Sequence, residues 1–513
     1  MDKFKINYKE PKPIENGLVK TDLFNKDPLF AVNSKNNLKS YKVVKSWNEA
    51  YALHEDLKYS DINPRFLALL INGENSSDVS PYKRIIRFPR STFFLIKNGQ
   101  ICQNFKESPL RGIGQKIPYE ILANQIKTSF IKSIKDSISD ETQNICCEQS
   151  SGLDSNTIIG ILIKSIKIPP NQLLTWSLEV PSEVKLIREF RNHFKLNPNN
   201  YLKPNKDAYN FENRESKRVS IIKSLGAPLL IDSESFPYKK LKDFGCKIFF
   251  SGLGGDQGLS HSGINVQNDL AQQGRLIELF KWHENYFYSF KTILRNLYSF
   301  FRPNWYESRI NNQHKLNLLN RFLTEKGKIL IDKYPSKKIY WEFDRYSNIN
   351  HSIRHRITAD WVSIRAEEEF RLAEKYGIRK IFPFLNEEIV NILINQDCLY
   401  LSNNKNNGRR IMRTSFSDFL PEFLINNPSK LRPYDRSKLL KKIEEKNKKL
   451  LEKYIISSYS WNDHLKELWD LEALRTECRI SLLKDYDLEI IIDIRTYLER
   501  MCSISEWFNI LDN

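Results

Sequence analysis

The spacing of apolar residues changes along the chain from a strand-like to a helical pattern. The first part contains short runs of β-branched and aromatic residues, which predict strands at residues 41–44, 84–88 and 92–96. The dipeptide Asn98-Gly99 follows the last run and predicts a hairpin, because both residues accept the positive φ of a type I′ turn. Residues 1–40 are polar and weakly patterned, which predicts irregular or edge structure.

Helical and strand-like patterns alternate in the middle of the chain. Apolar residues recur at helical spacing over residues 119–139. The shorter segments that follow predict strands at 144–149, 172–180 and 246–250 and helices at 156–167 and 182–194. Such alternation is typical of an α/β fold with a doubly wound parallel sheet, which binds ligands at the carboxyl ends of its strands.

The last part of the chain is helical in pattern from residue 265 onward and includes an amphipathic segment at 488–501, while the charged run at 437–449 is typical of a solvated helix face. Residues 108–118 contain two glycines and two prolines and are the best candidate for a linker. We therefore expect three parts. These are a small β-rich domain over residues 1–115, an α/β domain with a helical second half over 116–435, and a helical extension over 436–513 that packs on the α/β domain.

Composition excludes several classes of protein. Hydrophobic residues make up 40% of the 513-residue chain, too many for a disordered protein, yet no stretch approaches the roughly 18 apolar residues of a membrane helix. The N-terminus has no apolar core of a secretory signal, and seven scattered cysteines without a CxxC pair argue against a disulfide framework and a structural zinc site. We expect a cytoplasmic protein without a membrane partner.

The net charge of +18 has two interpretations. It can serve an anionic partner such as nucleic acid, an acidic peptide or nucleotide phosphates. It can also reflect composition alone, since the chain is rich in Lys, Asn and Ile. Because the sequence has no basic stripe with interleaved aromatic residues, we favour the compositional explanation and expect no nucleic-acid partner.

The predicted strand at 144–149 runs into a loop of small and polar residues directly before a predicted helix: Ser150, Ser151, Gly152, Leu153, Asp154 and Ser155. Small residues let backbone amides approach a phosphate, and the N-terminus of the following helix adds a favourable dipole. Asp154 would repel phosphate unless a cation lay between them, which indicates Mg²⁺. The loop has no lysine, so it is not a Walker loop.

A second cluster of the same kind follows the predicted strand at 246–250: Ser251, Gly252, Leu253, Gly254, Gly255 and Asp256. Two strand ends, each with one aspartate, could clamp a nucleotide and its metal between Asp154 and Asp256. Either loop alone can instead be a helix cap. The two together, each directly after a short apolar strand, favour a nucleotide site.

These clusters resemble the SGGxDS pyrophosphate loop and the SGxGxDE motif of asparagine synthetases, an arrangement shared by β-lactam synthetases and lasso-peptide cyclases. Further along, RAE (365–367) and GIRKIFPFLN (377–386) resemble the R-x-D/E and PFLD elements of the family. RRIMR (409–413) and the stretch from Leu420-Pro421 to Lys430 resemble its K-x-x-L-R and LP…K elements. The resemblance covers residues 120–435 in the family's order.

The resemblance implies a PP-loop fold similar to the adenine nucleotide α-hydrolases, and an ATP-dependent amide ligase. In the family, a substrate carboxylate attacks the α-phosphorus of ATP, pyrophosphate leaves, and ammonia or an amine then attacks the acyl-adenylate. The implied cofactors are ATP and Mg²⁺, with the metal held by Asp154 and Asp256 and with Glu367 and Arg409 as catalytic candidates. The implied ATP-binding residues are Ser150, Ser151, Gly152, Asp154, Ser155, Ser251, Gly252, Gly254, Gly255 and Asp256.

The resemblance implies two kinds of partner: a small-molecule or peptide carboxylate, and ammonia or an amine donor. Whether the chain forms a homodimer stays open. Two alternatives to a ligase remain. A tRNA-modifying enzyme with the same loop is favoured by the basic charge and disfavoured by the second cluster and the later elements. A non-catalytic family member is favoured by the departures at Ser151 and Arg409.

The chain departs from the family pattern at several positions. Ser151 replaces a loop glycine, Leu253 stands where the family has an acidic residue or tyrosine, and Asn386 replaces the aspartate of PFLD. Arg409 replaces a lysine; it keeps the charge but cannot be deprotonated, and it could equally be a surface residue beside an Asn-rich loop. Glu367 either faces the acyl site or belongs to the charged face of a helix.

The N-terminal part resembles a shortened glutaminase domain. Asparagine synthetases begin with such a domain, and its N-terminal cysteine is the nucleophile. In this chain the first cysteine is Cys102, while residues 80–98 resemble the late strands of that domain. We expect a trimmed, inactive remnant that packs on the α/β domain.

Three further features give weaker signals. His351 and His355 are spaced to share a helical face, but no third metal ligand accompanies them, so a core or surface pair is favoured. His261 follows the second cluster closely and either contacts substrate or has a capping or surface role. GIGQK (112–116) lacks the Ser or Thr of a Walker motif and belongs to the linker.

Overall fold

The computed structural model describes most of the chain, with interruptions. The described residues are 14, 16–24, 28–34, 37–54, 56–72, 78–98, 100–106, 110, 116–138, 144–178, 183–203, 219–223, 226–228, 238–263, 265–283, 286–301, 321–335, 348–404, 408–427, 452, 461–483 and 488–512.

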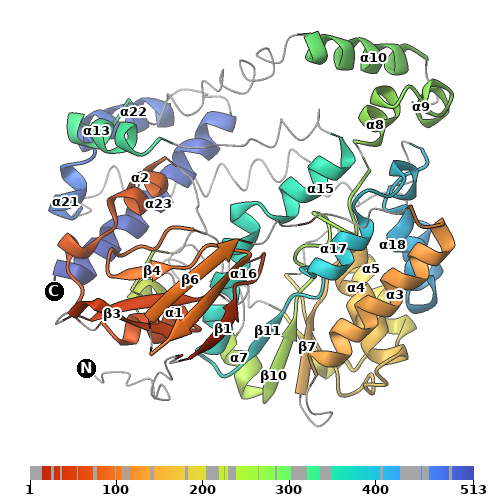
Figure 1. Cartoon of the computed structure of the whole chain (residues 1–513), viewed down its shortest axis with the longest axis horizontal. Coiled ribbons are helices and arrows are strands. Elements are labelled where there is room, and N and C mark those ends of the chain that lie inside the picture. The colour runs from red at the N-terminus through yellow and green to blue at the C-terminus, as the bar shows by residue number, and fades with distance from the viewer. Residues whose placement is uncertain are drawn as a thin grey trace.

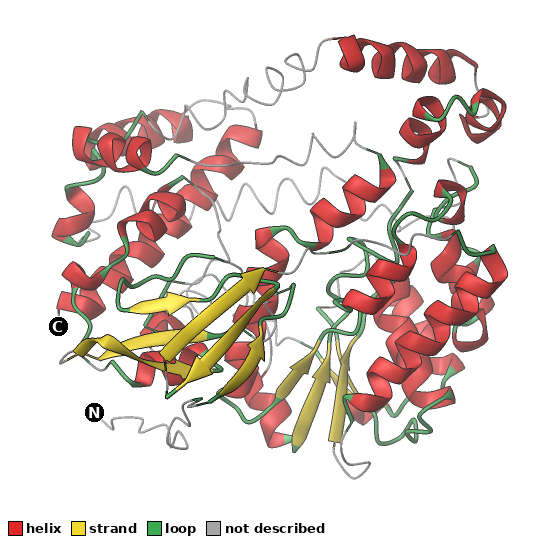
Figure 2. Cartoon of the chain, in the orientation of Figure 1, coloured by secondary structure: helices red, strands yellow, loops and turns green. Residues whose placement is uncertain are grey.

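A five-stranded parallel sheet forms the centre of the α/β domain (Figures 1 and 2). Its strands are, in order across the sheet, β11 (Arg379–Ile381), β10 (Cys246–Phe250), β7 (Asn144–Glu148), β8 (Leu174–Trp176) and β9 (Tyr201–Leu202). Strands are therefore present in the segments predicted at 144–149, 172–180 and 246–250, although in the described part of the second segment the strand covers only residues 174–176. The chain moves outward from β7 through β8 to β9, then returns to β10 on the other side of β7, so the winding direction reverses between β7 and β10.

Apolar side chains cover both faces of this sheet. On one face, Ile145 and Phe250 share a core with α3 (Tyr119–Asp136) and α4 (Leu153–Lys164). On the other face, Phe249 packs with α7 (Tyr238–Asp243) and α16 (Asp360–Glu374). Figure 1 shows the sheet between these two helical layers. The expectation of a doubly wound α/β fold is confirmed.

The described part of the chain beyond residue 265 is mostly helical, as predicted, and β11 is its only named strand. The predicted helix at 488–501 is part of a longer one, whereas 437–449 and most of the predicted linker lie outside the described residues. None of the helices in the described ranges is both long and apolar enough to cross a bilayer. The helices are α8 (Val266–Gln272), α9 (Leu276–His283), α10 (Tyr286–Phe301), α13 (Glu325–Lys333), α15 (Ile349–Ile357), α17 (Glu387–Leu393), α18 (Arg410–Ser415), α19 (Glu422–Ile425), α21 (Asp463–Lys466), α22 (Leu471–Leu483) and α23 (Leu488–Asp512).

The N-terminal residues form two three-stranded antiparallel sheets with two short helices. One sheet has the order β1-β5-β6 and the other β3-β2-β4. Strands β5 and β6 pair with Lys97 opposite Gln100, and Asn98 between them has a φ of 50°, so the predicted hairpin is present. The elements are β1 (Gly17–Lys20), β2 (Phe30–Ser34), β3 (Asn37–Val44), β4 (Ile85–Arg87), β5 (Thr92–Lys97), β6 (Gln100–Lys106), α1 (Trp47–Ala52) and α2 (Pro64–Ile71).

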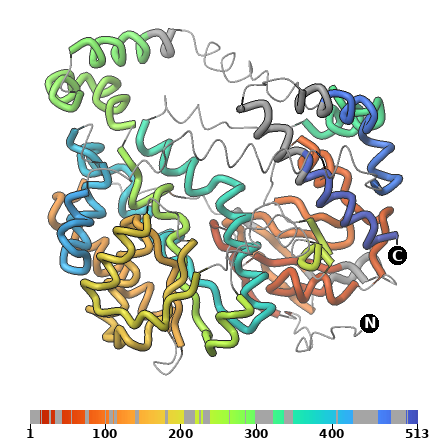
Figure 3. Tube along the Cα trace, turned by 180° about the vertical axis from the view of Figure 1, so that it is seen from behind, coloured from red at the N-terminus to blue at the C-terminus, as the bar shows by residue number. Residues whose placement is uncertain are grey.

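The C-terminal helices pack mainly with this N-terminal part, which differs from our expectation that they pack on the α/β domain. Trp469 and Trp507 lie in one core with Trp47 and Phe66 from α1 and α2, and α13 adds Ile331. Figure 3 shows α23 beside the N-terminal elements. The physical reason is that the small sheets and α1 and α2 leave large aromatic side chains uncovered, and the C-terminal tryptophans bury them.

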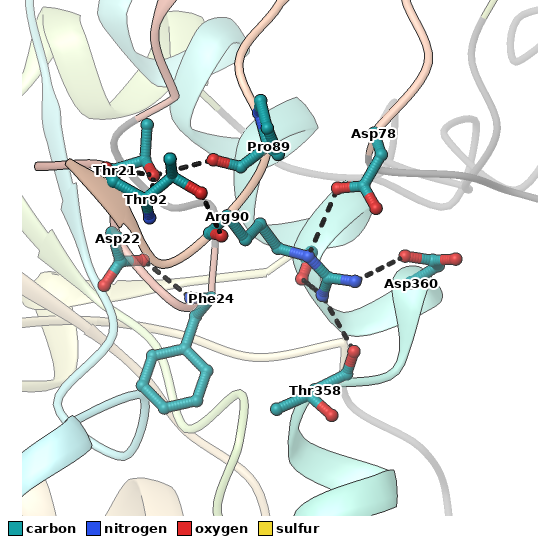
Figure 4. A network of polar contacts seen from close by, with 10 residues as sticks. Thr21, Asp22, Phe24, Asp78, Pro89, Arg90, Thr92, Thr358 and Asp360 are labelled. Atoms are coloured by element: carbon teal, nitrogen blue, oxygen red, sulfur yellow. Dashed lines mark hydrogen bonds and ion pairs between the residues drawn. The ribbon is translucent and has the colours of Figure 1, made fainter. Parts of the chain in front are cut away.

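Helix α16 is where the N-terminal part meets the α/β domain. The guanidinium of Arg90 donates to the carbonyl oxygen of Thr358 (2.8 Å) and to Asp360 Oδ1 (3.0 Å) at the start of α16 (Figure 4). Thr21 holds the turn before Arg90 by donating to the carbonyl oxygen of Pro89 (2.7 Å). Deeper in this interface, Arg87 of β4 donates to Glu367 Oε1 at 2.7 Å.

Replacing Arg87 with Met is expected to lower the free energy of unfolding by about 3 kcal/mol, because it leaves a buried carboxylate without its main partner. The side chains of Arg87 and Glu367 are only 6% and 2% exposed, and the next cation, Arg371, lies 3.7 Å from the same oxygen. Urea denaturation measures the loss. The double variant Arg87→Met/Glu367→Leu should recover most of it, and equal losses in the single and double variants would contradict this account.

Candidate nucleotide-binding site

Both predicted nucleotide loops lie at one edge of the parallel sheet, where the winding direction reverses. Residues 149–152 follow β7, and residues 251–256 follow the neighbouring strand β10. Because these strands are parallel, their carboxyl ends are adjacent, and such reversal points are where open α/β sheets bind ligands.

The first loop is held by hydroxyl and amide groups at the start of α4. Ser150 Oγ lies 3.0 Å from Ser155 Oγ and accepts from the N–H of Gly152 at 3.1 Å. Asn156 Nδ2 donates to the carbonyl oxygens of Ser150 and Gly152, both at 2.8 Å. Asn156 is a site-supporting residue that the sequence reasoning missed, because it was taken only as the first residue of a helix.

Helix α4 begins at Leu153, three residues before the predicted start at 156, with Gly152 as its N-cap. The apolar pattern that located the helix begins only after Asp154 and Ser155, which hid the first turn. Asp154 and Ser155 therefore lie in the first helical turn, where the dipole of a 12-residue helix favours negative charge. Ser151, which replaces a loop glycine, is half-buried between Ser150 and this turn.

The second loop lies directly against Asp154 and Ser155. A Cβ atom on Gly255 would be 2.4 Å from Asp154 Cγ, and one on Gly252 would be 3.2 Å from the backbone nitrogen of Ser155. Gly254 has a φ of 94°, a conformation that side chains disfavour. The two glycine contacts show that the structure brings the loops together and leaves Asp154 no room for a larger residue opposite it.

Arg409 reaches the second loop. Its Nη2 atom donates to Asp256 Oδ1 at 2.5 Å, and the two side chains are 13% and 35% exposed. Arg409 has a φ of 62° and immediately precedes α18. Of the two interpretations of Arg409, the structure supports a place in the site. The next residue, Arg410, faces elsewhere: it donates to the carbonyl oxygen of Leu399 and lies over the ring of Tyr119.

Glu367 is not brought to the loops. It is 1% exposed and points toward the N-terminal part, where it pairs with Arg87. Its neighbour Glu369 extends toward the sheet and pairs with Lys380 of β11 at 3.3 Å. Lys380 in turn donates to Glu148 at the end of β7 (2.6 Å). Sequence reasoning missed Lys380 and Glu148, although a glutamate at the end of an otherwise largely apolar strand was a signal.

The PFLN stretch lies beside the second loop. A Cβ atom on Gly254 would come within 2.5 Å of Leu385 Cδ2, and Leu253 packs in the same core as Phe384 and Leu385. Asn386 is the N-cap of α17 and accepts from the N–H groups of the first turn. Asparagine and aspartate are equivalent in this role, so the replacement of the family's aspartate is structurally neutral.

His261 is buried beneath the second loop. Its Nδ1 accepts from the N–H of Gly263 (3.0 Å), so the proton is on Nε2, which lies 3.1 Å from Ser352 Oγ. Burial, together with the nearby charges of Arg356 and Arg409, lowers the pKa of His261 to about 3. The histidine therefore stays neutral and holds backbone structure rather than exchanging protons near neutral pH.

Acid is expected to destabilise the protein through His261. The unfolded histidine binds a proton near pH 6.5 while the folded one does not until about pH 3, so stability is lost as the pH falls between these values. The loss should reach about 2 kcal/mol at pH 5. Urea denaturation of the wild type and His261→Gln at pH 7.5 and 5 measures it by difference, which removes the contribution of other groups. Equal losses in both proteins would contradict the assignment.

The structure describes only one of the other two weak signals in full, the pair of histidines at 351 and 355. His351 and His355 stack with ring centroids 6.1 Å apart, and the described residues hold no group of three metal-ligating side chains. Residues 112–115 of the GIGQK segment lie outside the described ranges.

The groups at the two loops fit a magnesium–nucleotide complex. Asp154 and Asp256 supply hard oxygen ligands, the hydroxyls of Ser150 and Ser155 and the first turn of α4 supply donors for phosphate, and Arg409 adds a positive charge. The space beside Asp154 is one that a Cβ on Gly255 would fill. The arrangement can bind a polyphosphate and stabilise negative charge on it.

The family model for asparagine synthase matches residues 125–484, most of the chain and all of the loop region described above. No curated protein matches the sequence.

Proposed function

Because the chain belongs to the asparagine synthase family of ATP-dependent amide ligases, we propose that it activates a substrate carboxylate as an acyl-adenylate and then amidates it. The observation that carries this proposal is the contact between the two strand-end loops. It sets Asp154 against Gly255, and Arg409 donates to Asp256 of the second loop.

In the first step, an oxygen of the substrate carboxylate attacks the α-phosphorus of ATP and the bond to pyrophosphate breaks. In the second, an amine or ammonia attacks the acyl carbon, AMP leaves, and the nitrogen loses a proton. Displacement at phosphorus depends more on positioned positive charge than on an acid or base. Bound Mg²⁺ supplies part of that charge and screens the phosphates from Asp154 and Asp256.

The residues of the chain divide these tasks. The hydroxyls of Ser150 and Ser155 and the amides of the first loop bind the leaving pyrophosphate. Asp154 and Asp256 would hold a bound metal from opposite loops. Arg409 would brace phosphate oxygens, a role suited to a guanidinium because it presents two parallel N–H donors.

The acyl half of the site differs from that of an asparagine synthetase. Leu253 is buried and apolar, so it neither orients an amine nor carries a proton. This favours a specialised carboxylate, such as a peptide or other complex molecule, with an amine or free ammonia as the second substrate.

Exchange of labelled pyrophosphate into ATP tests the proposal, because it reports acyl-adenylate formation without the nitrogen donor. The full chain with Mg²⁺ is assayed against aspartate, other amino acids and short peptides that carry a free carboxylate. Exchange that depends on one class of carboxylate is expected. Binding of ATP without exchange for any carboxylate would support a non-catalytic family member, and copurified tRNA would support the RNA-modifying alternative.

A further inference from the structure

Lys380 is a fully buried lysine that joins three elements beneath the nucleotide loops. Its side chain is 0% exposed, and Nζ lies 2.6 Å from Glu148 Oε1 on β7 and 3.3 Å from Glu369 Oε2 on α16. The ammonium also lies 3.5 Å from the centre of the Phe249 ring on β10. A buried lysine is costly unless it is paired, so its place between two carboxylates indicates a defined role.

The chain of hydrogen bonds continues from Glu148 into the second loop. Ser251 Oγ donates to the other oxygen of Glu148 at 2.9 Å and accepts from the N–H of Leu253 at 3.2 Å. At the far end, Arg365 Nε donates to Glu369 Oε1 at 2.7 Å. One chain of polar contacts thus runs from α16 to the second loop. It passes through five side chains, in the order Arg365, Glu369, Lys380, Glu148 and Ser251.

Ser251 is therefore fixed by Glu148, and Glu148 by Lys380. Glu148 alone would be free to rotate, because it is the last residue of β7 and its side chain is 17% exposed. The ammonium of Lys380 binds one carboxylate oxygen and leaves the other aimed at Ser251. Because Ser251 Oγ accepts from the N–H of Leu253, this contact helps to hold residues 251–253, and with them Gly252 against Ser155, alongside the bond from the N–H of Ser251 to the carbonyl oxygen of Ile381 (2.9 Å).

We infer that Lys380 is a positioning residue for nucleotide binding, acting through Glu148 on Ser251 without touching the nucleotide itself. This inference rests on the proposed function, since it presumes that the second loop binds ATP. A lysine that only stabilised the fold would affect stability without acting through Ser251, and this difference separates the two roles.

A double-mutant cycle tests the inference, with the affinity of the full chain for Mg²⁺–ATP measured by titration calorimetry. Lys380→Met and Ser251→Ala are each expected to weaken ATP binding about tenfold, as loss of a hydrogen bond to a charged group does. The double variant should bind ATP within about threefold of the weaker single variant, because both changes break one chain of contacts. If Lys380→Met does not fold, Lys380→Met/Glu148→Gln, which removes the uncompensated charge as well, takes its place in the cycle.

Arg87→Met is the matched control, because it also breaks a buried ion pair of α16 but on the side away from the loops. It should lower stability and leave ATP affinity within about twofold of the wild type. Additive effects in the cycle, wild-type affinity in Lys380→Met, or an equal loss of affinity in the control would each overturn the inference while the proposed function stands. Absence of ATP binding by the wild-type chain would overturn the proposed function and the inference with it.

Discussion

Replacing Asp154 with Asn is expected to lower the rate of carboxylate-dependent ATP–pyrophosphate exchange by roughly 10³-fold, because it removes preorganised charge from the reacting centre. The amide has the size of the carboxylate, so it fits the close space beside Gly255, where a Cβ would lie 2.4 Å from Asp154 Cγ. It lacks the negative charge that a hard cation requires of its ligand. The substitution therefore removes the negative charge of residue 154 while keeping the size of its side chain.

Asp154→Asn should change the exchange rate and its dependence on Mg²⁺ but not the stability of the fold. The melting temperature of Asp154→Asn should stay close to that of the wild type, since the lost attraction between the carboxylate and the helix N-terminus is offset by the lower cost of burying a neutral amide. Asp136→Asn, at the exposed end of α3, is the control and should leave exchange within about twofold, because surface changes away from the site have small effects. Exchange in Asp154→Asn above one tenth of the wild-type rate would exclude this residue as a metal ligand.

The nucleotide loops could be predicted from sequence because their signal is local. A short apolar strand, a run of small residues and an aspartate specify both the position of a loop on a sheet and its chemistry. The parallel sheet then brings the two loops together, with Gly255 against Asp154, without further information. Strand β9, with two residues, and β11, with three, are too short to show any periodicity and were missed.

Contacts between distant segments could not be predicted in this way. Glu367, Glu368 and Glu369 are adjacent in sequence and all buried, yet Glu367 pairs with Arg87 and Glu369 with Lys380. Which carboxylate faces which partner depends on the rotation of α16 between the N-terminal part and the sheet. The C-terminal tryptophans likewise give an apolar pattern that says nothing of which surface they cover.

The second large effect concerns Arg409, which the resemblance named as a catalytic candidate and which the structure shows in contact with Asp256. Arg409→Gln is expected to lower the exchange rate by about 10²-fold, because it removes a positive charge from the phosphate site. It should also lower the Mg²⁺ concentration needed for half-maximal rate, because Arg409 donates to Asp256 Oδ1 at 2.5 Å and competes there with the metal. General damage to the site would not produce a lower exchange rate together with a lower Mg²⁺ concentration for half-maximal rate.

Two arginine variants complete the test. Arg409→Lys keeps the charge but not the two parallel N–H donors. Its exchange rate should therefore be about tenfold higher than that of Arg409→Gln and still lower than that of the wild type. Arg410→Gln is the matched control from the same helix start, because Arg410 faces the carbonyl oxygen of Leu399 and the ring of Tyr119. Its rate and Mg²⁺ dependence should stay within about twofold of the wild type. A wild-type rate in Arg409→Gln would place Arg409 outside the chemistry, and an unchanged Mg²⁺ dependence at a reduced rate would show that its pairing with Asp256 does not compete with the metal.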